Sequence, residues 1–560
     1  MPTLDWIGKK AVVNHHREVP YRLIHCDGEL SAGDPDAGNL LVQGDNLEAL
    51  KALLPYYAGK VKFIYIDPPY NTGNEGWVYN DNVASPEIKA WLGKVVGKEA
   101  EDLSRHDKWL CMMYPRLRLL REFLREDGII AISISDVEIG NLKLMMNEVF
   151  GEHNFVAEVI VESNTRGQTY KAIARTHEYC LIYSRSDAAK LSEISDLDRK
   201  HKFKDERGGY ELWELRNRNP RFDRSNRPNL YFPFYAEPIA FEHDHHRVSL
   251  TRTSESQIEV FPVDGSGGDD CWRWSQKLVN NKKLTDDDPD LIARQTRKGK
   301  WTVWQRARKT TKSAKSILRG SEYINEAGTT LLTSMGMRAE FDHPKPLGLL
   351  KTIIELSTKE EDLILDSFSG SGTTGHAVLD LNKQDGGNRN FILVEMSENI
   401  ASKATAKRLG LAITGYNKGG DKEKPVEPLC GGFRYCRLGT PLFNEFGDID
   451  GCVIFPDLAA HVFFSETGSP LPHKVDGATT FIGTHKDKAI YLLFSPAEQG
   501  VAREASGNVL TPDALTNLPT PSNDFDDVRV VFAEGCTVSP EHLKSEGIVF
   551  KQIPYQIEGN

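Results

Sequence analysis

Short apolar runs alternate with amphipathic stretches over about the first 190 residues and again from about residue 347 onward. The runs are apolar at consecutive positions, as in parallel strands whose two faces are both covered by helices. They predict strands at 39–44, 62–67, 129–134, 155–161, 179–183, 363–368 and 390–395. The stretches between them predict helices, including one over 110–124 that ends at Asp127-Gly128. We therefore expect an α/β fold with an open, doubly wound and mostly parallel sheet.

The alternation stops near residue 190, and a different composition then extends to about residue 330. The stretch between is rich in Arg, Lys, Trp and turn-forming residues, with RNRNPRFDRSNRPNLYFPF (216–234) at its centre. A polar linker at 416–428 leads to a last segment with several short strand-like runs. These shifts predict four parts, in which 1–190 and 331–415 form one α/β domain, 191–330 is an inserted domain, and 416–560 is a C-terminal accessory α/β domain.

The composition is that of an ordinary globular protein, with 39% hydrophobic and 27% charged residues among 560. No apolar run approaches the roughly 20 residues that span a bilayer, and the N-terminus has no apolar signal core. We therefore expect a cytoplasmic protein without a membrane partner. The eight cysteines form no CxxC pair, which argues against a zinc ribbon and a disulfide framework. We expect no metal site and interpret the histidine-rich cluster at 242–246 as a solvated turn.

The tetrapeptide Asp67-Pro68-Pro69-Tyr70 directly follows the predicted strand 62–67. In a parallel sheet, ligands bind beyond the carboxyl ends of the strands. Two prolines fix the backbone and remove two N–H donors, so this loop offers an acid, carbonyl acceptors and an aromatic face. Such groups suit a planar substrate that bears an amino group, although a proline-stiffened turn with a capping Asp would have the same sequence.

A glycine-rich stretch, Phe368 to Gly375, follows the predicted strand 363–368 and satisfies the pattern GxGxxG. Glycines let the backbone approach a ligand closely, and Glu395, at the end of the next strand, can accept hydrogen bonds from ribose hydroxyls. A dehydrogenase that binds a dinucleotide would show the same pattern. The stretch therefore indicates a nucleotide-like ligand without naming it.

The two motifs together resemble those of the DNA amino-methyltransferases that use S-adenosylmethionine, in the permuted order with the catalytic tetrapeptide first. The fold implied is the Rossmann-like methyltransferase fold. GDNLEAL, IDPPYNTG, the segment 135–155, NRPNLYFPF and HPKP, in this order, resemble the modification (Mod) subunit of type III restriction-modification systems. The resemblance covers roughly residues 39–410. The tetrapeptide has the form usual for adenine-N6 rather than cytosine-N4 enzymes.

This resemblance implies S-adenosylmethionine as cofactor, S-adenosylhomocysteine as product, and base flipping of an adenine in duplex DNA. The catalytic residues would be Asp67, Pro68, Pro69 and Tyr70. Asp67 and the Pro68 carbonyl would accept hydrogen bonds from the target amine, and the Tyr70 ring would stack on the base. The cofactor-binding residues would be Asp45, Asn46, Asp67, His343, Lys345, Asp366, Phe368, Ser369, Gly370, Gly372, Thr373 and Glu395.

The charge distribution favours a DNA contact in the insert. The whole chain has a net charge of -11, but residues 199–319 hold 26 Lys and Arg against 17 Asp and Glu. Basic side chains neutralise phosphates or read guanines, and tryptophans stack on or wedge between bases. We expect the DNA-binding residues to be Arg216, Arg218, Arg221, Arg224, Arg227, Trp272 and Trp274, although surface ion pairs and a small tryptophan core are the alternative for each.

Several alternatives remain beside a site-specific adenine-N6 methyltransferase. The same fold could act on cytosine N4, the glycine loop could serve a dinucleotide oxidoreductase, or the chain could be a non-catalytic DNA-recognition subunit. A carbon-5 cytosine enzyme is disfavoured because no Pro-Cys dipeptide occurs. The resemblance also implies a homodimer and a partner, either a restriction subunit with helicase and nuclease activity or another defence-system protein.

Overall fold

The computed structural model describes residues 4–71, 104–167, 172–196, 199–282, 284, 289–296, 299–444, 448–495, 507–519, 521 and 528–553. Contacts divide the chain into a larger unit, Met1–Ser192 with Ala314–Asn560, and a smaller unit, Glu193–Ser313. The smaller unit falls inside the predicted insert 191–330, and residues 314–330 belong to the larger unit. None of the helices in the described residues combines the length and apolar character that a bilayer crossing requires.

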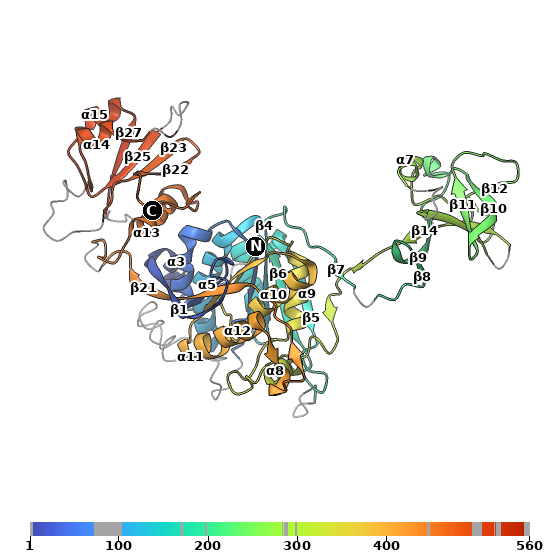
Figure 1. Cartoon of the computed structure of the whole chain (residues 1–560), viewed down its shortest axis with the longest axis horizontal. Helices are drawn as coiled ribbons and strands as arrows, with labels where there is room; N and C mark the ends of the chain where they lie inside the picture. The colour runs from blue at the N-terminus through green and yellow to red at the C-terminus, as the bar shows by residue number, and fades with distance from the viewer. Residues whose placement is uncertain are drawn as a thin grey trace. The chain divides into compact units, whose positions relative to one another are not determined.

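A sheet of ten strands among the described residues runs through the larger unit (Figure 1). Six consecutive strands, from β21 to β4, run parallel, and β1 and β6 pair antiparallel with β21 and β4. In spatial order the strands are β1 (Arg22–Gly33), β21 (Gly432–Pro441), β2 (Leu40–Gln43), β18 (Asn390–Glu395), β17 (Leu363–Asp366), β3 (Val61–Ile66), β4 (Leu124–Ile134), β6 (Glu178–Ser184), β5 (Phe155–Val161) and β16 (Ile317–Leu318).

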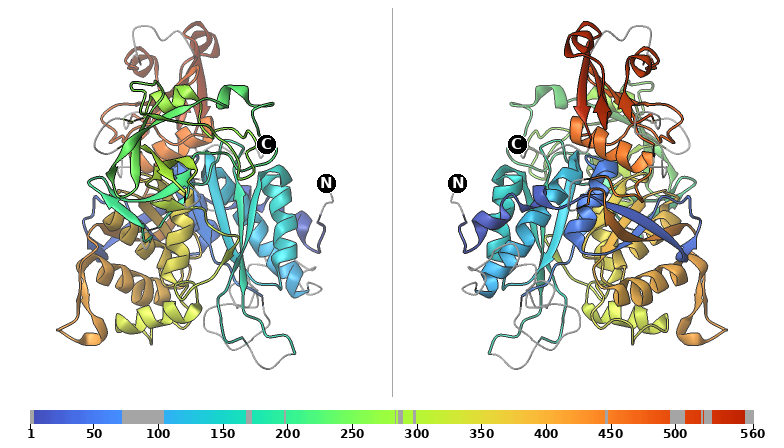
Figure 2. Two further views of the ribbon diagram at one scale, coloured as in Figure 1. Left: turned by 90° about the vertical axis from the view of Figure 1, so that its right-hand side faces the viewer. Right: turned by 90° about the vertical axis from the view of Figure 1, so that its left-hand side faces the viewer.

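Helices cover both faces of this sheet (Figure 2). Ile64 and Ile66 of β3 join one apolar core, with α3 (Asn46–Tyr57), α5 (Arg105–Phe123) and α6 (Ile139–Phe150). Phe63 and Tyr65 point to the opposite core, with α9 (Leu347–Ser357), α10 (Thr373–Asp385) and α12 (Lys407–Thr414). Successive strand residues face opposite ways, so burial on both faces requires the continuous apolar runs seen in the sequence. The predicted doubly wound, mostly parallel fold is confirmed.

The smaller unit is built around an antiparallel sheet in the order β12-β10-β11-β13-β14-β9-β8. Phe234, Trp272 and Val303 are fully buried in its core. Its elements are β7 (Ile194–Ser195), β8 (Phe203–Asp205), β9 (Gly208–Glu214), β10 (Phe234–Glu242), β11 (His245–Ser249), β12 (Ile258–Val260), α7 (Gln276–Asn280), β13 (Leu291–Gln295), β14 (Trp301–Ala307) and β15 (Thr311–Lys312).

The C-terminal segment adds a sheet of its own, in the order β22-β23-β25-β27. Strand β21, however, belongs to the central sheet, although residue 416 was the predicted start of the accessory domain. The remaining elements are α1 (Lys9–Val12), α2 (His15–Glu18), α8 (Asn325–Ser334), α11 (Glu398–Ile400), β19 (Tyr416–Asn417), β20 (Pro425–Val426), α13 (Phe455–Thr467), β22 (Phe481–His485), β23 (Lys488–Leu492), β24 (Val509–Leu510), α14 (Pro512–Thr516), β25 (Val528–Ala533), β26 (Gly535–Cys536), α15 (Pro540–Ser545) and β27 (Ile548–Gln552).

One disulfide joins two cysteines whose spacing along the chain gave no signal of pairing. Cys26 of β1 and Cys436 of β21 are joined although 410 residues separate them. The two strands are antiparallel neighbours, and these cysteines lie directly opposite each other in the register. Sequence spacing could not reveal the pair, because only the closing of the sheet brings it together.

Candidate active site

The carboxyl ends of β3 and β17 meet at one edge of the central sheet. The two strands are parallel neighbours, with Ile364 paired with Phe63. Neighbouring strands lie about 5 Å apart. Asp366 ends β17 and Asp67 follows β3, so two motifs that are far apart in the sequence lie side by side.

A buried cluster of charged groups surrounds Asp67. The Lys345 ammonium lies 3.3 Å from Asp67 Oδ1 and donates hydrogen bonds to Glu178 Oε1 at 3.0 Å and Oε2 at 2.9 Å. It also donates to the Tyr70 hydroxyl, which in turn donates to Glu178 Oε2 at 3.1 Å. The same ammonium lies 4.7 Å from the centre of the Tyr70 ring. Four side chains from three separate stretches of sequence therefore hold one another in place.

Burial sets the protonation of this cluster. It raises the pKa of Asp67 to about 6, an effect that Lys345 opposes and Glu178 adds to. Burial alone would lower the pKa of Lys345, but the carboxylates of Asp67 and Glu178 outweigh it and raise that pKa. Lys345 is therefore a permanent cation. Asp67 instead titrates within the range where enzymes work, which is typical of functional groups.

The proline loop leaves one carbonyl available. The indole Nε1 of Trp109 donates to the Pro69 carbonyl at 2.7 Å, whereas no described residue donates to the carbonyl of Pro68. Asn71 has a positive φ of 54°, and its amide donates to the buried Glu138, which anchors the end of the loop. Asp67 and the Pro68 carbonyl thus remain as two adjacent acceptors. Thr72 and Gly73, the end of the IDPPYNTG motif, lie outside the described residues.

The glycine loop after β17 is held by Glu395. Its two carboxylate oxygens accept hydrogen bonds from the backbone N–H groups of Gly370, at 3.0 Å, and Ser397, at 2.9 Å. Gly370 and Gly372 have positive φ values of 49° and 76°. A Cβ at Gly372 would lie 2.8 Å from the side chain of Thr405. The loop therefore requires glycine both for its backbone conformation and for its packing.

Asp366 is nearly fully buried between the two motifs. It accepts hydrogen bonds from the Thr374 hydroxyl, at 2.5 Å, and the Phe368 N–H, at 3.0 Å. Burial nevertheless raises its pKa to about 7, and the nearby charge of Asp67 adds to this effect. Two acids at adjacent strand ends thus both have elevated pKa values.

Asp45 and Asn46 begin α3 at the same edge of the sheet. Asp45 caps the helix by accepting from the N–H groups of Leu47 and Glu48. Arg116 pairs with Asp45 at 3.1 Å and donates to the Asn46 side-chain oxygen. The Asn46 amide donates to the Ser367 carbonyl at 3.3 Å, which links α3 to the glycine loop.

The other predicted cofactor residues lie on two stretches. Lys345 reaches the Asp67 cluster, but His343 is exposed on the same loop before α9. Phe368 packs partly against the apolar core, and Thr373 begins α10, where its hydroxyl lies 3.4 Å from the Lys345 carbonyl.

These residues fit S-adenosylmethionine, the cofactor that the resemblance implies. The hydroxyls of Ser367 and Ser369 are buried, yet neither has a hydrogen-bond partner within the described chain. Buried polar groups without partners call for a ligand or ordered water. Together with the glycine loop and the Glu395 carboxylate, they make a site for a ligand with several polar groups.

Residues of this edge that the sequence patterns did not predict include Glu178, Arg116, Trp109 and Arg408. Glu178 directly precedes the predicted strand 179–183, and an acid at the start of an apolar strand was the available signal in the sequence. The structure shows that this acid is buried. Because β6 runs antiparallel to β4, its first residue lies where the parallel strands end. That direction was not evident from the sequence.

The predicted DNA-binding arginines of the smaller unit differ in their surroundings. Arg216 pairs with Glu214 at 2.8 Å and with Asp270 at 2.5 Å, so its charge is neutralised within the protein. Arg224 is exposed and pairs with Asp269 at 2.9 Å. The exposed arginines of the set are Arg218, Arg221, Arg224 and Arg227.

The two tryptophans predicted to bind DNA both pack within the protein. The prediction is wrong for Trp272. The Trp272 side chain is 1% exposed and its indole N–H donates to the Phe232 carbonyl at 2.7 Å, so it is a core residue and no longer a candidate for base stacking. Trp274 is half-buried, with the Lys282 ammonium 5.4 Å from its ring.

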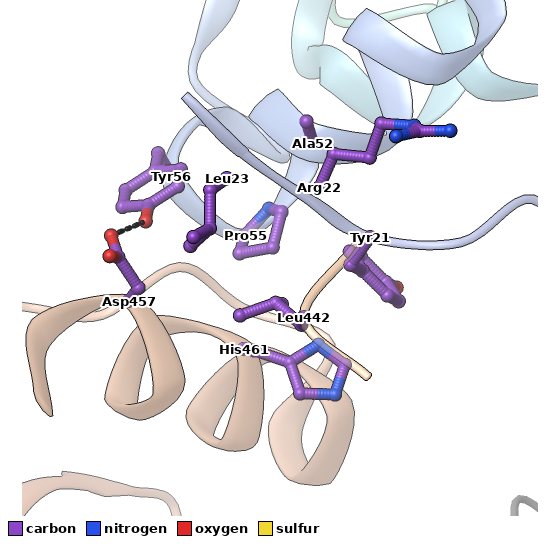
Figure 3. A pocket seen from close by; sticks show the side chains of 9 residues that line it. All are labelled: Tyr21, Arg22, Leu23, Ala52, Pro55, Tyr56, Leu442, Asp457 and His461. Carbon is purple, nitrogen blue, oxygen red and sulfur yellow. Dashed lines mark hydrogen bonds between the residues drawn. The ribbon is translucent and has the colours of Figure 1, made fainter. Parts of the chain in front are cut away.

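A small pocket lies away from this edge, between α3, β1 and α13 (Figure 3). In it the Tyr56 hydroxyl donates to Asp457 at 3.1 Å. Both ring nitrogens of the buried His461 lack hydrogen-bond partners among the described residues, and burial lowers its pKa to about 4. None of the residues that line this pocket belongs to the Asp67 or Asp366 motifs, so the pocket is not the candidate active site.

A profile of the family described as DNA methylase (N6_N4_Mtase) matches residues 61–407, more than half of the chain. The chain belongs to this DNA methylase family. The matched range begins at β3 and ends at the start of α12, so it includes the Asp67 cluster, the glycine loop and the whole smaller unit.

Named relatives share much of the chain. The type III restriction-modification enzyme EcoPI Mod subunit of Escherichia phage P1 is 34% identical over 435 residues, 73% of this chain and 65% of that protein. The type II methyltransferase M.KpnI of Klebsiella pneumoniae is 32% identical over 390 residues, 68% of this chain and 86% of the relative. The type III StyLTI Mod subunit of Salmonella typhimurium is 28% identical over 536 residues, 90% of this chain and 74% of the relative. This last similarity extends beyond residues 39–410.

Proposed function

We propose that this chain is a site-specific DNA methyltransferase that transfers a methyl group from S-adenosylmethionine to the N6 amine of adenine. The observation that supports it best is the adjacency of the Asp67 cluster and the glycine loop at one edge of the sheet. A second support is the similarity to Mod subunits and type II methyltransferases. The chain spans 65% of the EcoPI Mod subunit, so its role as a type III-like modification subunit is part of the proposal.

The reaction requires a poor nucleophile to become a better one. The lone pair of an adenine N6 amine is delocalised into the ring, so the amine must be held with its two N–H groups directed at acceptors. Asp67 and the Pro68 carbonyl are two such acceptors, and the Trp109 bond to Pro69 keeps the loop in place. Their contribution is orientation and fixed electrostatics, prepared before the substrate arrives.

Bound S-adenosylmethionine supplies the electrophilic methyl group and its leaving group. Glu395 would hold the ribose, Asn46 the adenine, and the loop from Asp366 to Thr373 the amino-acid end. Asp366 keeps this loop in place through its bonds to Thr374 and Phe368.

The target amine is inaccessible inside a duplex, so the base must leave the stack. The Tyr70 ring is the stacking face, because the hydrogen bond of its hydroxyl to Glu178 and the Lys345 ammonium near its ring fix its orientation. The exposed arginines of the smaller unit supply phosphate contacts, and Trp274 remains a candidate for base stacking.

Expression of the chain alone in a methylation-free host, followed by sequencing of modified bases, tests this function. Methylated adenine at one sequence is the expected result. Methylated cytosine would favour the N4 reaction, and no methylation with intact cofactor binding would favour a DNA-recognition subunit. The same host carrying a candidate restriction subunit, and light scattering of the pure chain, test the proposed partner and homodimer.

The role of Asp67 is tested by substitution. Asp67→Ala and Tyr70→Ala should lower tritium transfer to DNA at least about a hundredfold while cofactor binding persists. Asp380→Ala is the matched control and should transfer normally, because it removes a partly exposed acid of α10 that pairs with Lys351 of α9. Transfer at the wild-type rate by Asp67→Ala would overturn the assignment.

A further inference from the structure

Arg408 of α12 is fully buried under the glycine loop. Its Nη1 donates to the hydroxyls of Ser371, at 2.9 Å, and Thr373, at 2.7 Å, and its Nε donates to His376 at 3.3 Å. Its Nη2 has no hydrogen-bond partner, and no Asp or Glu pairs with it, among the residues that the structure describes.

A buried charge without a counter-charge is unfavourable, and proteins rarely keep one. Burial lowers the pKa of Arg408 to about 9, and only Tyr416 acts in the opposite direction. The helix α10 begins at Thr373, so the positive end of its dipole lies at the same place. Two positive features thus coincide at the start of α10. Asp366 accepts from Thr374 there, but no Asp or Glu of the described residues pairs with Arg408.

The neighbouring hydroxyls can extend this positive region to the loop. Arg408 donates to the oxygens of Ser371 and Thr373, so each hydroxyl keeps its own proton to donate. In the described structure these protons have only long contacts, from Thr373 to the Lys345 carbonyl at 3.4 Å and between the two hydroxyls at 3.4 Å, which a carboxylate acceptor can replace. The hydroxyl of Ser369, 6% exposed, also lacks a partner within the described residues. Three hydroxyls and a helix N-terminus, with a guanidinium behind them, make a site for a carboxylate.

We propose that Arg408 is a positioning residue for the α-carboxylate of S-adenosylmethionine, acting through the hydroxyls of Ser371 and Thr373. The inference rests on the proposed function, which supplies a cofactor with that carboxylate. The charge of the guanidinium compensates the carboxylate, and the two hydroxyls transmit the interaction by hydrogen bonds. The amino-acid end is then held at α10, next to the backbone of Lys345, whose side chain contacts Asp67.

A cycle of two ligands and two proteins tests this. Calorimetry measures the affinity of the wild type and of Arg408→Gln for S-adenosylmethionine and for its decarboxylated analogue. Arg408→Gln should weaken S-adenosylmethionine about tenfold to a hundredfold, the usual range for a charge-assisted hydrogen bond, and leave the analogue unchanged. Arg389→Gln is the matched control, because Arg389 is also buried but pairs with Asp385. It should change thermal stability without changing the preference between ligands.

Equal weakening of both ligands by Arg408→Gln would mean a structural role and would overturn the inference. If that variant does not fold, Ser371→Ala keeps the guanidinium and removes one of the two hydroxyls. A reduced preference for the carboxylate supports the inference, and an unchanged preference overturns it. A wild type that transfers methyl groups but binds both ligands equally contradicts only the inference, whereas one that binds neither contradicts the proposed function as well.

Discussion

Methyl transfer should depend on pH through Asp67, and Glu178 should set where that dependence lies. Ionised Asp67 is a stronger acceptor for the N–H groups of the proposed target amine than protonated Asp67, so transfer should follow the ionised fraction. With a pKa of about 6, it is roughly 90% ionised at about pH 7 and roughly 10% at about pH 5. The rate should therefore fall about tenfold between these values as the acceptor gains a proton.

Substituting Glu178 by Gln separates charge from shape. The amide oxygen can still accept the Tyr70 hydroxyl, but a negative charge near Asp67 is lost while the Lys345 cation remains. The groups whose charges act on Asp67 or are acted on by it are Lys345, Glu178, Tyr70, Tyr65, Cys180 and Asp366. Loss of one like charge should lower the pKa of Asp67 by about one unit. The fall in transfer rate on the acid side of the pH profile, called the acid limb, should then occur at lower pH.

Single-turnover transfer of tritiated methyl groups to plasmid DNA, measured between about pH 5 and pH 8, reports the chemical step without product release. Carboxyl-labelled aspartate, with the Asp67 resonance assigned by its loss in Asp67→Asn, reports the same pKa without turnover. Glu158→Gln is the control, since Glu158 also pairs with a lysine, Lys143 at 2.9 Å, but lies outside the site. An acid limb that stays in place, or moves to higher pH, in Glu178→Gln would refute this reasoning.

Three further outcomes are expected. Gly372→Ala should abolish cofactor binding in calorimetry and cost about 1–3 kcal/mol in thermal denaturation, whereas Gly386→Ala, with a similar φ of 74° and open space around it, should keep binding. Asp366→Asn should gain about 3 kcal/mol of stability relative to the wild type between about pH 5 and pH 8. The reason is that the raised folded-state pKa of Asp366 contributes stability to the wild type that is lost as pH rises through about 7. A difference in melting temperature that does not change with pH would contradict this. Arg221→Ala should weaken DNA binding at every sequence and reduce the salt slope by about one, with the ion-paired Arg216→Ala as the comparison for structural loss.

Local patterns in the sequence were enough to predict the central sheet and the two motifs. Apolar runs such as 62–67 predict buried strands because both faces are covered, and a motif that follows such a run lies at the sheet edge. Helix signals in the local sequence failed where the same residues pair with a strand that is distant in the sequence. The helix predicted to end at Asp127-Gly128 ends at Phe123, because Leu124 pairs with Val61 in the sheet and the chain continues as β4.

The sequence by itself determined that the chain belongs to the DNA methylase family and predicted the kind of chemistry, since that prediction rests on the residue types and spacing of Asp67–Tyr70 and the glycine loop. The tertiary structure alone decided which groups tune that chemistry. Glu178 reaches Lys345 because β6 is antiparallel to its neighbour β4. Arg408 reaches Ser371 because α12 packs under the glycine loop. Burial then sets their charges, and burial depends on strands and helices that meet only after the whole chain has folded.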